Sequence, residues 1–177
     1  MKTITIDELK GIDSSLERIV SEYRFQQEWT ALDILKLPES LVNNLDKLGL
    51  VLCEDLIDAP VLHEFACRCA ERALSRIDNP DSRSVAAIAA KRAWLEDETK
   101  DEELSEASAD VCDAAFFAGS VTDDVDAAYW AANAASWTIA WYAAYWSASY
   151  AAYCSADVAA ERAWQVDVLI KILEEEE

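Results

Sequence analysis

The stretch DAAYWAANAASWTIAWYAAYWSASYAAYCSAD, residues 126–157, decides the fold of this chain. Between its two terminal aspartates lie 30 residues without a charge, of which 13 are alanine and nine are Trp or Tyr. Alanine has the highest helix propensity of all residues, so the stretch is expected to be helical. At about 100° per residue, Trp130 and Trp141 fall on one side of that helix and Trp146 falls on the opposite side. Aromatic residues on two opposed faces leave no side for water, which predicts one long helix, capped by Thr122, buried at the centre of a bundle.

A membrane-spanning helix is the alternative for so long an uncharged stretch, because about 20 apolar residues cross a bilayer. Against it, the stretch carries Asn133 and five serines or threonines, alanine in place of Leu or Ile, and no Lys or Arg near either end. We therefore expect no contact with a membrane. The opening MKTITIDELKGID has no apolar signal-peptide segment, and the five cysteines have no disulfide spacing, which favours a cytoplasmic protein with free thiols.

The scarcity of turn residues limits the possible folds. Only three glycines and three prolines occur in 177 residues, too few for a strand-rich fold or for a phosphate-binding loop. No low-complexity linker divides the chain. We predict a single all-α domain over residues 1–177, a helical bundle in which short helices over 1–57 precede an alanine-rich part over 58–173.

Capping signals and apolar periodicity place the individual helices. Two capping boxes, Thr5–Glu8 and Ser14–Glu17, are expected to begin the first of them. A short helix over about 38–48 has Pro38 in its first turn and Gly49 at its end. After the turn NPDSRS, a serine is expected to cap the next helix. The other helices are predicted at about 30–36, 60–76, 84–95, 101–118 and 157–173.

The formal net charge of −20 is concentrated in one segment, since residues 96–126 hold 12 acids and a single base, Lys100. This charge disfavours direct binding to nucleic acid or to an anionic membrane. On the helix predicted over 101–118, acids recur every three or four residues and share one face, without the Lys/Glu alternation of ordinary exposed helices. A merely solvated face is the alternative explanation. The expected partner-binding residues are Glu102, Glu103, Glu106, Asp110 and Asp113, with Asp123 and Asp124 beside them.

His63, Cys67, Cys69 and Glu71 form the one cluster with metal-ligand character. Positions 63, 67 and 71 share a helix face, but Cys67 and Cys69 point about 200° apart on a helix and cannot join one site. The chain has a single histidine, no CxxC motif, and no nucleophile motif around a serine or cysteine. We therefore expect no metal, no cofactor and no enzymatic activity.

Three segments carry a resemblance to a known family: PDSRSVAAIAAKRAWLEDETKDEELSEAS, the Ala/Trp/Tyr-rich stretch after it, and the closing AERAWQVDVLIKIL. With PDSRS, DEEL and ERAWQ as anchors, residues 58–173 resemble a family of bacterial and phage proteins described as immunity proteins. The resemblance implies a small cytosolic protein that binds and neutralises a toxin and that has no catalytic residues. This chain departs from the family pattern by carrying Trp, Tyr and Ser where arginines are often scattered through the alanine repeats.

These observations predict a non-enzymatic acidic inhibitor that docks on a basic surface of a partner protein, such as a toxin, a nuclease or a defence effector. One alternative is a phage-encoded DNA mimic acting against CRISPR or restriction enzymes, because a rigid row of carboxylates can imitate a phosphate backbone. A second alternative is a structural helical oligomer, in which the Trp and Tyr faces contact other copies of the chain.

Overall fold

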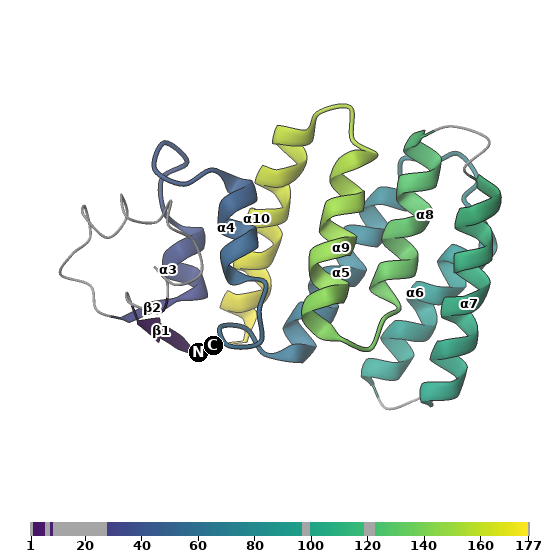
Figure 1. Ribbon diagram of the computed structural model, residues 1–177, viewed down its shortest axis with the longest axis horizontal. Helices are drawn as coiled ribbons and strands as arrows, with labels where there is room; N and C mark the ends of the chain where they lie inside the picture. Colours follow the sequence, from purple (N-terminus) through teal and green to yellow (C-terminus); the bar gives the residue numbers. More distant parts are fainter. Residues whose placement is uncertain (1, 6–7, 9–27, 97–99, 119–122, 177) are drawn as a thin grey trace.

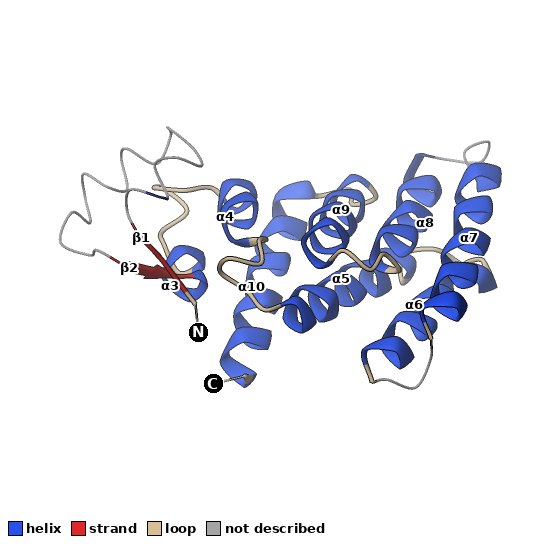
Figure 2. Cartoon of the chain, turned by 60° about the horizontal axis from the view of Figure 1, so that its bottom comes forward, coloured by secondary structure: helices blue, strands red, loops and turns tan. Residues whose placement is uncertain are grey.

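The computed structural model describes residues 2–5, 8, 28–96, 100–118 and 123–176 (Figure 1). Figure 2 shows the helices in two rows, with α4, α9, α8 and α7 in one and α3, α10, α5 and α6 in the other. One hydrophobic cluster runs through both rows, from Ile4 to Leu173, and the predicted all-α class is confirmed. The helices are α3 (Ala31–Leu35), α4 (Asn44–Val51), α5 (Ala59–Leu74), α6 (Ser82–Leu95), α7 (Asp101–Ala118), α8 (Asp123–Ala135), α9 (Ala140–Tyr153) and α10 (Val158–Glu175).

The described residues contain one small antiparallel β-ribbon, which the composition did not predict. It pairs β1 (Thr3–Thr5) with β2 (Glu28–Thr30), and Ile4 lies opposite Trp29. Both of these side chains are buried, so the ribbon contributes to the core while its other residues face outward. Two strands of three residues are stable only when packed on something else, and here α3 follows β2 directly and contacts it.

Side-chain caps mark the start of several helices, and some of these caps differ from the prediction. The hydrogen bonds of the Thr5–Glu8 capping box are confirmed, since Thr5 N–H donates to Glu8 Oε2 (2.8 Å) and Glu8 N–H donates to Thr5 Oγ1 (3.4 Å); the helix predicted to follow lies outside the described residues. The Ser14–Glu17 box lies outside the described residues. α6 is capped by Asp81 and not by a serine, because the Asp81 carboxylate accepts the Arg83 N–H (2.9 Å).

The helix predicted over 38–48 is wrong in position. Asn43 is the residue that caps α4, since its side-chain oxygen accepts the Asp46 N–H (2.9 Å). Pro38 therefore lies in the turn before the helix, and Gly49 lies inside α4 and does not end it. An Asn cap satisfies one of the free N–H groups at a helix start, which Pro38 has no side-chain oxygen to do.

The predicted long central helix is in fact two helices, α8 and α9, which lie side by side and are joined by a reversal over residues 136–139 (Figure 1). At the end of α8, Ser136 Oγ donates to Asn133 O (2.6 Å). From α6, Lys91 Nζ donates to Trp137 O (2.8 Å). A lysine at a helix C-terminus satisfies a free carbonyl and complements the helix dipole. A residue 46 positions away in sequence therefore helps to hold the reversal.

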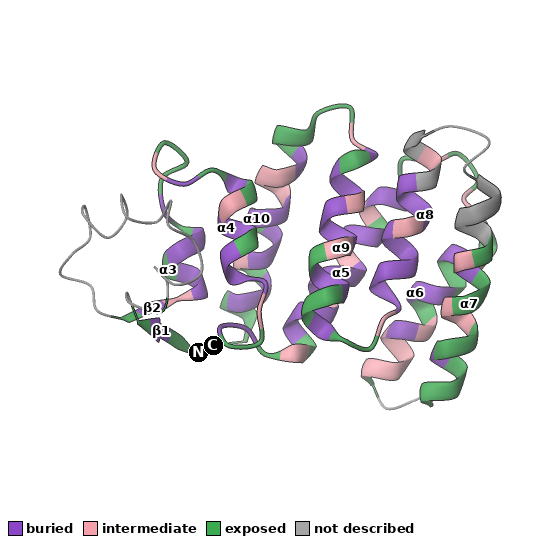
Figure 3. Cartoon of the chain, viewed as in Figure 1, coloured by how far each residue is buried: buried purple, intermediate pink, exposed green. Residues whose placement is uncertain are grey.

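The buried faces of α8 and α9 are made mainly of alanine, and Figure 3 shows how much of both helices is buried. On α9 every buried residue is Ala or Ser, whereas Trp141, Tyr142, Tyr145 and Tyr153 are exposed. The alanines recur every three or four residues and form the stripe that packs on α5 and α8. The expectation of a helix buried on all sides by its aromatic residues was therefore wrong, because on α9 small side chains fill the interfaces and every aromatic residue is at least partly exposed.

α10 is joined to α5 and α9 by a buried polar network. The side chain of Glu161 is fully buried and pairs with Arg72 Nε of α5 (2.8 Å) and with Arg76, which lies just after the end of α5. Gln165 Nε2 donates to Ala148 O of α9 (2.8 Å). The ERAWQ segment that anchors the family resemblance is therefore a structural joint between three helices.

The N-terminal elements also depend on α10. Both α3 and α4 pack against it, and Lys36 Nζ pairs with Glu174 Oε1 (2.8 Å). Elements that are far apart in the sequence, α3 and α4 on one side and α10 on the other, therefore pack together.

Replacing Glu161 by Gln should lower the free energy of unfolding by about 3 kcal/mol, because it leaves two guanidinium groups without their carboxylate. Asp167→Asn is the matched control, since it removes the same charge from an exposed position of the same helix and should cost under about 0.5 kcal/mol. Urea unfolding followed by circular dichroism measures both. Equal small losses would show that Glu161 does not hold α10 in place.

Candidate functional site

The acidic residues predicted on the helix over 101–118 lie together on α7, at one end of the array (Figure 1). We call Glu102, Glu103, Glu106, Asp110 and Asp113 the acidic row; all five are exposed. α7 carries no Lys or Arg. None of the ion pairs between described residues involves Glu102, Glu106, Asp110 or Asp113. The row therefore presents carboxylates to solvent at steps of about one helical turn, or about 5.4 Å.

Asp123 and Asp124, the two other predicted contact residues, lie in the first turn of α8, which packs against α7. Their side chains lie outside the described part of the structure. The predicted residues that the structure brings onto one surface are therefore the five of the acidic row.

Arg83 of α6 lies within electrostatic reach of the C-terminal end of the row. Its guanidinium is held mainly by Asp81, which accepts from Nε (3.1 Å) and Nη2 (2.8 Å). These hydrogen bonds raise the pKa of Arg83, and the nearby charges of Asp113 and Asp110 raise it further. α6 thus balances part of the negative charge at that end.

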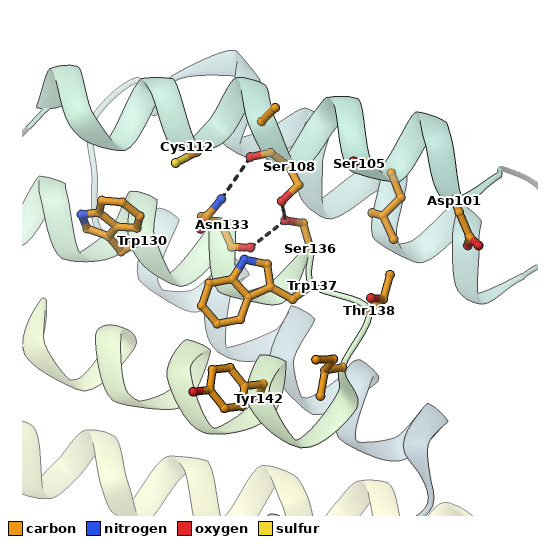
Figure 4. A pocket seen from close by; sticks show the side chains of 13 residues that line it. Asp101, Ser105, Ser108, Cys112, Trp130, Asn133, Ser136, Trp137, Thr138 and Tyr142 are labelled. Atoms are coloured by element: carbon orange, nitrogen blue, oxygen red, sulfur yellow. Dashed lines mark hydrogen bonds between the residues drawn. The ribbon is translucent and has the colours of Figure 1, made fainter.

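Beside the acidic row, a groove of about 770 Å³ runs between α7, α8 and the start of α9 (Figure 4). Asp101, Ser105 and Ser108 of α7 contribute to one wall, and Trp137 and Tyr142 lie opposite. The lining contains one carboxylate and no Lys, Arg or His. The groove-facing positions of α7 lie roughly 140° around the helix from the acidic row, so α7 contributes to both surfaces.

Most polar groups in the groove satisfy one another. Asn133 Nδ2 donates to Ser108 O (3.0 Å), and Ser136 Oγ lies 2.9 Å from Ser108 Oγ (Figure 4). These bonds fix α7 on α8. At the far end, Asp101 Oδ1 accepts Trp94 Nε1–H (2.7 Å), which orients that carboxylate. What the groove offers to a ligand is therefore mainly ring faces and the charge of Asp101.

The aromatic rings continue from the groove along α9. The ring centres of Trp137 and Tyr142 are 5.7 Å apart, and those of Tyr142 and Trp146 are 6.4 Å apart. We call these three residues the ring ladder. Trp141 packs edge-on against Tyr142 at 4.4 Å. Such contacts hold the rings in fixed positions although Trp141 and Tyr142 remain exposed.

Two other tryptophans already have a cationic side chain of the protein over their rings. The guanidinium carbon of Arg72 lies 4.2 Å from the centre of the Trp164 ring, and Lys91 Nζ lies 3.8 Å from that of Trp94. Among the described residues, no cation lies over a ring of the ladder. The protein therefore uses cation–ring contacts internally and leaves the ladder open for others.

The groove and the ring ladder were not part of the predicted site. Both depend on the reversal between α8 and α9, where the sequence has only SWTI, residues 136–139, interrupting the alanine run. Ile139 precedes α9 without a side-chain cap, so no capping signal marked the break. A second occurrence of AAYW, at 127–130 and again at 143–146, is the signal that could have suggested two equivalent helices.

A buried pair of bases lies beneath the reversal. Lys91 is fully buried, and burial lowers its pKa to about 8. Burial, followed by the charge of Lys91, lowers the pKa of His63 to about 4, against a hydrogen bond with the backbone of Thr138. His63 is therefore neutral at pH 7, and its ring packs edge-on against Trp94 at 5.4 Å. The pair supports the reversal from the side opposite to solvent.

The residues with metal-ligand character do not form a site. Burial raises the pKa of Cys67 to about 12 and raises that of Cys69 well above its usual value. Glu71 pairs instead with Arg92 Nε (2.8 Å). Within the described ranges, no group of three or more His, Cys, Asp or Glu could hold a metal ion. The two thiols stay protonated, and a protonated thiol is a poor ligand and a poor nucleophile.

Two further results bear on the site. No helix of the described segments has the length and apolar character to cross a bilayer. Comparison of the chain with protein-family models, with curated proteins and with solved structures gives no match.

Lowering the pH from 7 to 5 should destabilise the protein through His63. Its folded pKa of about 4 lies below the ordinary value of 6.5, so the unfolded chain binds the proton more tightly, and stability present above pH 6.5 is lost as the pH falls. We expect the wild type to lose about 2 kcal/mol more unfolding free energy over this interval than His63→Gln, measured by urea unfolding. The same pH dependence in both proteins would show that His63 is not held neutral.

Proposed function

We propose that this protein is a non-enzymatic binding protein that docks through the acidic row of α7 on a basic surface of a partner protein and blocks that surface. The proposal is carried by one observation: five exposed carboxylates follow one another along a helix that has no base of its own. Neighbouring like charges on a helix cost a few tenths of a kcal/mol per pair. A basic partner would relieve that repulsion and would be attracted from a distance by the charge.

Two kinds of partner fit this chemistry. The family resemblance favours a toxin that the protein neutralises, in which case the row would cover a basic surface of the toxin. A DNA mimic is the other version, because regularly spaced carboxylates on a rigid helix offer a nucleic-acid-binding enzyme the negative charge that it normally finds on phosphates. Both versions predict binding that weakens as salt is added.

Reversing three charges of the row, in Glu102→Lys, Glu106→Lys and Asp110→Lys together, should abolish partner binding without changing helicity, since all three side chains are exposed. The tagged protein is used to capture its partner from the native cell, mass spectrometry identifies the partner, and the affinity of the purified pair is then measured.

The matched control reverses Glu54, Asp55 and Asp78 to Lys, which are exposed and lie outside α7. Both triple variants change the net charge from −20 to −14. Binding that survives in the control and is lost in the α7 variant supports the proposal. Equal loss in both would point to total charge, and unaltered binding in the α7 variant would remove the acidic row from the proposal.

The exposed aromatic residues of α9 favour a second candidate, self-association. Trp141 is 43% exposed, Tyr145 40% and Tyr153 71%, and rings of this size are typical of protein interfaces. The charge of −20 on each copy opposes such contact, so salt would have to strengthen it.

If α9 is a self-association face, sedimentation should show dimers whose fraction rises with salt concentration and falls in Trp141→Ser/Tyr145→Ser, because the salt screens the repulsion and the substitutions remove the rings. Val85→Ser, an exposed apolar residue of α6, is the control. A protein that stays monomeric at every salt concentration would exclude this candidate.

A further inference from the structure

We infer that the groove between α7 and α9 receives an extended, arginine-bearing segment of the partner, whose guanidinium groups stack on Trp137 and Tyr142 and pair with Asp101. The inference rests on the proposed function, since it names the chemistry of the surface that meets α7. It concerns the groove, a different face of α7 from the acidic row.

The ring faces are the first reason for a cationic occupant. The face of an aromatic ring is electronegative and attracts a cation placed over it. Tyr142 is 38% exposed and Trp141 beside it is 43% exposed, so a cation can reach both. The protein shows the same arrangement internally, where Arg72 lies over Trp164 at 4.2 Å.

The charge around the groove is the second reason. The groove lining has a carboxylate and no Lys, Arg or His, so an entering cation displaces no base of the protein from the lining. The acidic row lies on another face of the same helix and adds to the negative potential around the groove. Arginine suits these walls better than lysine, because its planar guanidinium stacks flat on a ring while its edge pairs with a carboxylate.

The length of the groove sets the length of the segment. Along α7 the lining extends from Asp101 to Cys112, a rise of about 16 Å at about 1.5 Å per residue. An extended chain covers that distance in about five residues. Alternate side chains of an extended segment point the same way, so arginines at the first, third and fifth positions would face the groove together.

Other occupants fit less well. A second copy of this chain would bring a further charge of −20 to an acidic surface. Nucleic acid could stack its bases on the rings, but its phosphates would meet the carboxylates of α7. An uncharged segment would gain nothing from Asp101 or from the row.

The test uses a fluorescein-labelled peptide, Arg-Ala-Arg-Ala-Arg, and the full-length protein, with binding followed by fluorescence anisotropy at low salt. We expect saturable binding that becomes about threefold to thirtyfold weaker in Tyr142→Ala. Asp101→Asn, which keeps the acceptor for Trp94, should weaken it as well. The matched lysine peptide should bind less tightly than the arginine peptide, and the glutamine peptide should not bind.

Tyr153→Ala is the control variant, because Tyr153 is an exposed tyrosine of the same helix outside the groove lining, and it should leave the peptide affinity unchanged. Circular dichroism of each variant shows that the fold is kept. Equal binding of the glutamine peptide, equal affinity of wild type and Tyr142→Ala, or no binding at about 1 mM peptide would each overturn the inference.

The two proposals fail separately. If the peptide does not bind while the triple variant of the acidic row still abolishes partner binding, the groove inference falls and the proposed function stands. If the peptide binds through Tyr142 while the triple variant keeps its partner, the role of the acidic row falls and the groove remains a site for cationic segments.

Discussion

Close packing of helices through alanine is the constraint on which this structure depends. α9 meets α5 and α8 through a stripe of alanines and serines, and α8 presents alanines in return. Small side chains let the backbones approach closely, but each buries little apolar area, so many are needed. The large rings of α9 lie along the edges of these interfaces, which places Tyr142 at the groove and Trp141 and Tyr145 in contact with solvent.

Buried charges at two joints complement the alanine packing. KRAW in α6 and ERAW in α10 each begin with a buried charged residue and end with a tryptophan that lies under a cation. Lys91 reaches the reversal between α8 and α9, and Glu161 reaches Arg72 of α5 and Arg76 just after that helix. Such groups are costly to bury unless they are paired, so each joint tolerates few alternatives in how its helices are placed. α7 remains free of these joints and presents its acids outward.

Local sequence signals predicted the positions of the helices more accurately than they predicted how the helices pack on one another. The all-α class and the helix over 101–118 could be predicted, because alanine content, caps and periodicity are local properties. The break after α8 could not, since Lys91 acts from another helix. The sequence also did not determine which face of α9 is buried, because alanines and aromatic residues both recur at helical spacing. The neighbouring helices determine that the alanine face is the buried one. The groove, which needs α7 placed on α8, was therefore missed, whereas the acidic row lies on a single helix and was predicted.

The packing of α3 and α4 on α10 has a consequence for biosynthesis. A ribosome makes chains at about 5–20 residues per second, so the partner helix of α4 follows it by roughly 5 to 20 s. During that interval α4, whose Leu48 and Val51 are buried in the finished protein, lacks one of the helices that it packs against. A nascent chain of this kind would offer chaperones a hydrophobic surface on α4 until α10 emerges.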